Sequence, residues 1–306
     1  MTSDWKKAAK DKADSVNNLI PKEWRIPAPP SIEEQRDVTG SFIQQYLDKK
    51  EIEITETDAV GIVKQTSSGA WSAVEVAKAF CHRAAVAHQL VNCLHEIFFD
   101  AAIADAEKAD QYLKEHKKPI GLLHGLPVSL KDQFHVKDVE TSMGYVGWLG
   151  TFQGKKDTGK ERKFESEMVK ELRALGATLF CKTSVPHTLM CGETVNNIIG
   201  YTYNPKNRNL SSGGSSGGEG ALIGLRGSPV GFGTDIGGEC CVSKISDRSA
   251  ITDGLKARSV FQQPSTASTA SARQPAGYHT KAWPTAWTAR TASSQSSVRW
   301  QPPPTP

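Results

Sequence analysis

A break in composition after Gly238 limits how much of this 306-residue chain can fold into a compact domain. From residue 262 to the end, the sequence contains no Ile, Leu, Met, Asp or Glu. Ser, Thr, Ala, Pro and Gln dominate this stretch, and its tryptophans stand apart from one another. Such a segment cannot bury enough apolar surface to offset the entropy lost on ordering. The sequence therefore predicts a disordered tail over residues 239–306, with the folded part before it.

The charge and composition of the chain exclude several classes of partner. The net charge is only +4 at pH 7, with basic residues spread among acidic ones, whereas nucleic-acid binding needs a concentrated basic face. No apolar run approaches the roughly twenty residues needed to cross a bilayer, and the N-terminus carries no secretory signal. The six cysteines have no metal-binding spacing, so neither a disulfide framework nor a zinc site is predicted. We expect a cytoplasmic protein without nucleic-acid or membrane partners and of unknown oligomeric state.

Residues 1–118 have the apolar periodicity of amphipathic helices. One helix is expected from Trp5 to Ile20 and a second from Ser72 to Leu90, where Ser72 is placed to cap the N-terminus. A third is expected from Asp100 to Glu115. The second and third helices would each pack one face against a core and leave their charged residues in water.

Residues 119–238 alternate between short apolar runs and a helical segment. Residues 126–130 predict a strand that leads into Lys131, and residues 164–175 predict a helix followed by a strand at 178–180. This alternation favours an α/β sheet with helices on its faces. A lysine at the end of an apolar strand would be partly buried, which lowers its pKa and makes it available as a neutral base. Most lysines, however, are solvated surface charges.

Two glycine-rich stretches follow. The first, Asn209 to Gly220, is expected to be a loop, and such runs are most often flexible linkers. A phosphate-binding loop is less favoured, because no Gly-Lys-Ser/Thr follows it. The second, residues 231–238, reads GFGTDIGG. Its glycines let backbone N–H groups converge, which suits an oxyanion hole as well as a tight turn.

Taken together, these segments carry a recognisable pattern. Residues 125–132 read GLPVSLKD, residues 213–222 read GGSSGGEGAL, and residues 233–238 read GTDIGG. Supporting matches are TSVP at 183–186 and NPKNRNL at 204–210. Over residues 5–238 the chain resembles the amidase signature family, and its segment IPKEWRI at 20–26 is similar to fungal acetamidase-like members.

The resemblance implies an amidase-signature fold, an α/β domain with a mixed β-sheet core flanked by helices, here truncated at its C-terminal part. It implies hydrolysis of a small-molecule carboxylic amide to acid and ammonia by a Ser–Ser–Lys triad, without metal or cofactor. Lys131 would be the neutral base, and Ser215, held on a cis peptide bond, would be the bridging serine. The backbone N–H groups of Ile236, Gly237 and Gly238 would line the oxyanion hole.

One departure from the family falls on the nucleophile. The family has a serine after this last motif, whereas this sequence has Glu239. A carboxylate cannot attack an amide as an alkoxide would, and it could pair with Lys131 instead. Cys240 is one residue on, and its side chain would point elsewhere. The chain as written is therefore expected to be inactive.

The genetic code offers an explanation for this departure. Residues 238–240 can be written GGT GAG TGT, which contains the strong intron donor GTGAGT, while Thr252-Asp253 and Lys256 can supply a branch point and an acceptor. Joining the first base of codon 238 directly to codon 257 shifts the frame, and the following codons then permit Gly-Ser-Ile-Arg-Phe-Pro-Ala-Ala-Phe-Asn-Gly-Leu-Tyr-Gly-Leu. We interpret residues 239–256 as a translated, unspliced intron and the remainder as out of frame.

Other interpretations stay open. Within the family, the chain could be an amidotransferase subunit that acts on charged transfer RNA, although the acetamidase-like N-terminal segment disfavours this. From a different class, it could be a non-catalytic truncated product that binds amides or a partner. Asn209–Gly220 could also be a mere linker between two modules. The histidines show no ligand or triad spacing and are expected to be ordinary surface or core residues: His82, His88, His95 and His124.

Overall fold

The computed structural model describes residues 5–235. The predicted tail over 239–306 lies outside the described residues, as do the predicted site residues Ile236, Gly237, Gly238 and Glu239. Within residues 5–235, no helix combines the length and apolar character needed to cross a membrane.

The first half of the described chain is helical, as its periodicity predicts. Ser72 accepts a hydrogen bond from the Glu75 backbone N–H at 3.0 Å and so begins the helix α5. The Asp110 carboxylate accepts from two further N–H groups in the first turn of α5, which ties α6 to α5. The helical elements are α1 (Trp5–Asn18), η1 (Lys22–Trp24), α2 (Ser41–Gln44), α3 (Lys49–Glu56), α4 (Ala59–Ser68), α5 (Ala73–Val91) and α6 (Phe99–His116).

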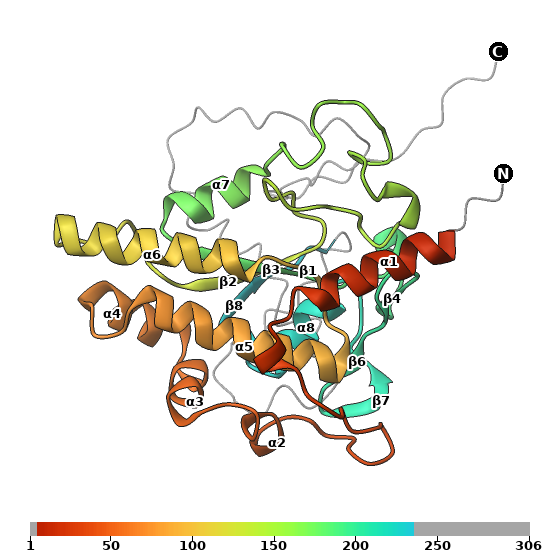
Figure 1. Cartoon of the computed structure of the whole chain (residues 1–306), viewed down its shortest axis with the longest axis horizontal. Coiled ribbons are helices and arrows are strands. Elements are labelled where there is room, and N and C mark those ends of the chain that lie inside the picture. Colours follow the sequence, from red (N-terminus) through yellow and green to blue (C-terminus); the bar gives the residue numbers. More distant parts are fainter. Residues whose placement is uncertain (1–4, 236–306) are drawn as a thin grey trace, which may run out of the picture.

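The centre of the fold is a mixed sheet in the order β1-β3-β2-β8 (Figure 1). Strand β2 (Pro127–Lys131) runs parallel to β3 (Thr178–Thr183) and to β8 (Val230–Phe232), whereas β1 (Leu94–Ile97) is antiparallel to β3. Every residue of β1, β2 and β3 is buried. The expected α/β fold with a mixed sheet is therefore confirmed.

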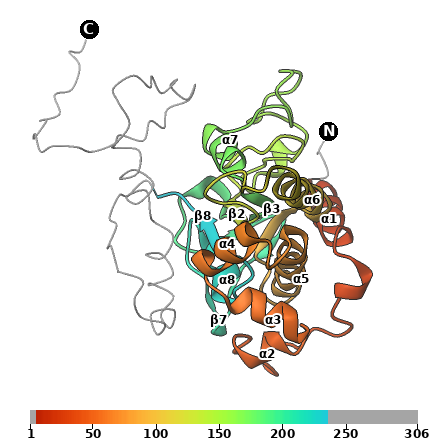
Figure 2. The same cartoon turned by 90° about the vertical axis from the view of Figure 1, so that its left-hand side faces the viewer.

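Helices cover both faces of this sheet. Figures 1 and 2 agree in showing α7 (Glu167–Ala174) on one side and α5 with α8 (Gly217–Gly224) on the other. Helix α5 is buried along most of its length because it also packs against α6 and α3. The remaining elements are η2 (Val146–Trp148), η3 (His187–Leu189), β4 (Val195–Asn196), β5 (Gly200–Tyr201), β6 (Tyr203–Asn204) and β7 (Asn207–Ser211).

The glycine-rich run is where the sequence prediction was wrong. Asn209–Gly220 was expected to be a loop, but β7 continues to Ser211 and α8 begins at Gly217. Gly217, Gly218 and Glu219 are buried in the first turn of α8. Glycine is needed here because α8 approaches other segments closely, not because the chain is flexible. This segment is therefore part of the packed domain and does not link two modules.

Gly218 gives the first testable prediction. A Cβ at this position would lie 2.3 Å from Ser184 N, 2.5 Å from Ser184 O and 2.8 Å from Cys93 O, all backbone atoms that cannot rotate away. Gly218→Ala is therefore expected to lower the free energy of unfolding by about 1–3 kcal/mol. Urea denaturation measures the change. Gly192→Ala is the matched control because a Cβ at that position would meet no other atom within 4 Å, and equal stability of the two variants would contradict the packing argument.

Candidate active site

Lys131 ends the buried strand β2 and is itself buried, with 1% of its surface exposed. Two other segments of the chain contact its Nζ atom. Ser215, in the turn before α8, places its Oγ 2.7 Å from Lys131 Nζ. Thr234, which follows β8, contributes its Oγ1 at 2.8 Å and its carbonyl oxygen at 3.1 Å. The parallel pairing of β2 with β8 brings Thr234 to the end of the sheet at which Lys131 lies.

The hydrogen-bonding groups around Lys131 suit a neutral amine. The Thr234 carbonyl can only accept, and the Thr234 hydroxyl donates its own proton to Gln133 Oε1 at 2.6 Å. Both Thr234 oxygens therefore accept from the two hydrogens of a neutral Nζ. That leaves the nitrogen lone pair for the hydroxyl proton of Ser215. With a third proton on Nζ, Ser215 would instead accept, so the same geometry serves both states of a base that gains and loses a proton.

Burial also prepares Lys131 to lose its proton. Desolvation lowers its pKa to about 7, although the carboxylates of Asp235 and Glu219 act in the opposite direction. A pKa near neutrality leaves a substantial fraction of the side chain as free amine at pH 7.

The turn that carries Ser215 is held by its own contacts. The peptide bond between Gly214 and Ser215 is cis, as the resemblance implied. Thr194 Oγ1 donates to the Gly213 carbonyl at 2.8 Å. Ser216 Oγ lies 3.3 Å from both the N and the O of Thr234, which joins this turn to the segment after β8. The hydroxyl of Ser215 is thus placed by backbone on both sides.

Asp132, the residue after the lysine, faces a different set of groups. Its carboxylate accepts the Met143 N–H at 2.7 Å and pairs with Lys182 Nζ at 2.8 Å, and all of these groups are buried. Lys182 comes from the neighbouring strand β3 and also donates to Thr141 Oγ1 at 2.7 Å. The Asp132 pKa stays below its ordinary value because burial, which would raise it, is outweighed by His95, Lys182 and these hydrogen bonds. Asp132 thereby anchors the end of β2 on which Lys131 stands.

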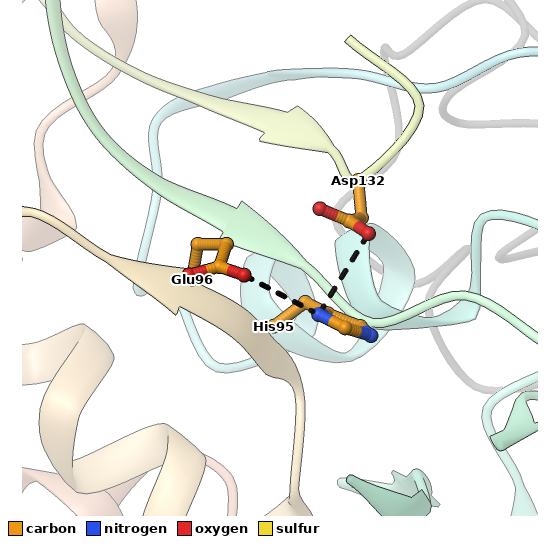
Figure 3. A group of neighbouring side chains, drawn as sticks. All are labelled: His95, Glu96 and Asp132. Atoms are coloured by element: carbon orange, nitrogen blue, oxygen red, sulfur yellow. Dashed lines mark ion pairs between the residues drawn. The ribbon is translucent and has the colours of Figure 1, made fainter. Parts of the chain in front are cut away.

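A cluster of metal-binding residue types lies beside Asp132 (Figure 3). His95 and Glu96 of β1 approach it, and the ligand atoms of the three residues lie within 4.8 Å of one another. His95 Nδ1 is 3.7 Å from Asp132 Oδ2 and 4.0 Å from Glu96 Oε1, distances too long for hydrogen bonds. Burial lowers the pKa of His95, although the charge of Asp132 acts in the opposite direction.

Two lysines already neutralise the carboxylates of this cluster. Lys182 pairs with Asp132 as described, and Lys12 of α1 pairs with Glu96 Oε1 at 2.7 Å and with Glu140 Oε2 at 3.0 Å. A divalent cation would have to lie next to two ammonium groups. We therefore interpret His95, Glu96 and Asp132 as part of a charge-balanced packing cluster. Their sequence spacing gave no sign of it, because a β-bulge between Leu94 and Glu96 and the β2–β3 pairing bring them together.

The structure thus brings two of the predicted site residues, Lys131 and Ser215, into direct contact, while the other four lie outside the described residues. Sequence reasoning missed Thr234 and Gln133. Thr234 lies within the GTDIGG segment, whose predicted role is confined to the backbone N–H groups of its last three residues. Gln133, two residues after Lys131, carries no signal of its own.

Comparisons with known proteins show the family to which the chain belongs. Residues 75–239 match the protein family described as Amidase. The chain is 49% identical over 238 residues to the acetamidase of Emericella nidulans, and 48% identical over 242 residues to the acetamidase of Aspergillus oryzae. These alignments cover 78% of the chain but 41% and 42% of the relatives. The chain therefore spans about two fifths of the length of the curated relatives it matches.

Solved structures of hydrolases that act on amides are also similar to this chain. The fold is similar to that of a structure described as fatty acid amide hydrolase, with a TM-score of 0.70 and 39% sequence identity. That match covers 78% of this chain and 41% of the other. A second structure, described as an amidase, matches with a TM-score of 0.51 and 28% identity over 60% of this chain and 40% of the other.

Proposed function

The chain belongs to the amidase family, and on that premise we propose that it carries the base and the bridging serine of a Ser–Ser–Lys site for amide hydrolysis. The proposed substrate is a small carboxylic amide, which is converted to the acid and ammonia. Two fungal relatives named acetamidase support a small acyl group. The observation that carries the proposal is the 2.7 Å contact between Ser215 Oγ and the buried Lys131 Nζ.

In the proposed reaction, protons move along three groups. The neutral amine of Lys131 takes the proton of Ser215, which takes the proton of the nucleophilic serine as that serine attacks the amide carbon. When the tetrahedral intermediate collapses, the Lys131 ammonium returns the proton through Ser215 to the leaving nitrogen, and ammonia departs. Water then cleaves the acyl-serine by the same relay and releases the acid. The backbone N–H groups of Ile236, Gly237 and Gly238 are proposed to stabilise the oxyanion.

The nucleophile of this reaction is the group that this chain lacks. Glu239 stands where the family has its serine, and a carboxylate there has no hydroxyl proton to pass to Ser215. We propose that this chain does not hydrolyse amides. We further propose that amides are hydrolysed by the product of the spliced message, which lacks residues 239–256 and can encode Gly-Ser-Ile-Arg at the nucleophile position.

Sequencing of transcripts across codons 230 to 270 tests the origin of Glu239. We expect most mature messages to lack the segment that encodes residues 239–256. Messages that retain this segment throughout would contradict the unspliced-intron interpretation. In that case the alternative, a non-catalytic product that binds amides or a partner, would become the better proposal.

The function itself is tested by ammonia release. Two proteins are purified, the chain with Glu239 and the product of the spliced message. Each is incubated with acetamide and with longer aliphatic amides. We expect release of ammonia by the reading with the restored serine and none by the chain with Glu239. Binding of acetamide to the Glu239 chain without turnover, together with an inactive restored reading, would favour the non-catalytic alternative.

A further inference from the structure

Glu219 is a buried carboxyl group that the reaction described above does not use. It lies in the first turn of α8, four residues after Ser215, and none of its surface is exposed. Its Oε2 accepts a hydrogen bond from Ser129 Oγ at 2.7 Å, and its Oε1 accepts one from Thr183 Oγ1 at 3.0 Å. Ser129 and Thr183 belong to β2 and β3, so one carboxyl group joins α8 to two adjacent strands of the sheet.

A third strand closes around the same carboxyl group. A Cβ on Gly231 of β8 would lie 2.0 Å from Glu219 Oε2 and 2.7 Å from Ser129 Oγ. Glu219 therefore packs directly on the backbone of β8, three residues before Thr234. Ser129 is two residues before Lys131 on β2, so the two side chains leave the strand on the same side. The carboxyl group thus contacts β2, which ends in Lys131, and β8, which leads to Thr234.

The charge of Glu219 is poorly compensated at this place. Within residues 5–235, no lysine, arginine or histidine forms an ion pair with it. The side chains that donate hydrogen bonds to it carry neutral hydroxyls, those of Ser129 and Thr183. Burial raises its pKa to about 7, while Ser129, Thr183 and the charge of Lys131 act in the opposite direction. Glu219 and Lys131 therefore gain or lose charge in the same pH range, and each favours the charged form of the other.

Besides Lys131, the titratable groups of residues 5–235 on which the charge of Glu219 acts are thiols. They are Cys93, which precedes β1, and Cys181 of β3. Burial raises the pKa of both thiols, the charge of Glu219 acts in the same direction, and both therefore stay neutral. Asp235 acts on Lys131 as a second carboxylate. Within residues 5–235, Glu219 and Asp235 are thus the carboxylates whose charge favours the Lys131 ammonium.

We propose that Glu219 is a positioning residue for Lys131: it fastens the ends of β2, β3 and β8 together, and its buried negative charge controls how readily Nζ gives up its proton. This inference rests on the proposed function, because it treats Lys131 as the base. Loss of the carboxylate charge is expected to make the ammonium less stable and to favour the free amine.

The test is a pH titration of Lys131 in the unaltered whole chain and in Glu219→Gln. NMR of lysine labelled with ¹³C at Cε monitors the titration. Lys131→Met assigns the signal. We expect the pKa of Lys131 in Glu219→Gln to fall by up to about one unit. Glu140→Gln is the matched control, since it removes another buried carboxylate that pairs with Lys12 and Arg162 and not with Lys131. An unchanged Lys131 midpoint in folded Glu219→Gln would overturn the proposal.

A second variant covers the case in which Glu219→Gln does not fold. Ser129→Ala removes a hydrogen bond that favours the ionised form of Glu219. The Glu219 pKa then rises, less negative charge faces Lys131, and the Lys131 midpoint is expected to fall by a smaller amount. Failure of this shift would also overturn the proposal. If unaltered Lys131 titrates near its ordinary 10.5, the proposed function fails instead, so the two failures are distinguishable.

Discussion

Replacing Lys131 by alanine is expected to lower kcat/KM for acetamide by about 10²–10⁴-fold in the product of the spliced message, which has serine at the nucleophile position. The variant removes the amine that takes the Ser215 proton across 2.7 Å. Lys131→Arg is expected to fail as well, because a guanidinium keeps the positive charge but cannot become neutral at any pH used. Ammonia release under initial-rate conditions measures both variants.

The matched control is Lys118→Ala, which removes an exposed lysine. It should hydrolyse acetamide at the unaltered rate. Full activity of Lys131→Arg would contradict the account, since it would show that the site needs a cation and not a base.

The pH profile of the same enzyme follows from the lowered pKa of Lys131. Because the proposed base is the free amine, kcat/KM should fall on the acid side of about pH 7, where Nζ becomes protonated. An ordinary lysine with a pKa of 10.5 would place this decline near pH 10 instead.

Lys12→Ala is expected to lower the free energy of unfolding by about 3–5 kcal/mol at pH 8. Lys12 extends from α1 to Glu96 and Glu140, and the side chains of all three are nearly buried. Its pKa is raised because the two carboxylates outweigh the effect of burial. The substitution leaves two buried carboxylates without their ammonium, and α1 loses its ionic attachment to β1.

The size of this effect should depend on pH. Burial already raises the pKa of Glu96 to about 7, above its ordinary 4.5, despite the charge of Lys12. An acid whose pKa is raised in the folded state binds more protons folded than unfolded, so its contribution to stability falls as pH rises from 4.5 through the folded-state value. Without Lys12 the folded pKa rises further, and the loss of stability should be smaller at pH 5 than at pH 8.

Urea denaturation at both pH values measures this difference. The matched control is Lys10→Ala on the same helix, because Lys10 pairs with Asp14 at an exposed site of α1. Little change is expected for Lys10→Ala. If Lys12→Ala is no less stable than Lys10→Ala at pH 8, the buried attachment does not hold α1 in place.

Much of this fold can be predicted from the sequence, because its signals are local. The periodicity of residues 72–90 and the Ser72 cap specify α5, and the apolar run before Lys131 specifies β2. Helix α7 begins later than the predicted residue 164, at Glu167, because the segment before it bends back so that the Ser166 N–H reaches the His135 carbonyl. The glycine-rich run was harder, since its composition favours a loop while close packing against Ser184 makes it the start of α8.

The site could be predicted only where a motif carries it. Lys131 and Ser215 are far apart in sequence, and only the family resemblance paired them. The role of Thr234 depends on β8 lying parallel to β2, and the environment of Glu219 depends on three strands meeting at one carboxyl group. Such contacts between distant segments leave no periodic trace in a single sequence.

The measurement that tests the central claim most directly is the pKa of Lys131 in the chain as it stands, read from the ¹³Cε signal that disappears in Lys131→Met. This claim, that Lys131 is a buried amine able to take the Ser215 proton, does not depend on the missing nucleophile. The account predicts a midpoint of about 7. A midpoint close to 10.5, the ordinary value for lysine, would contradict it, because Lys131 would then be a structural cation and not a base.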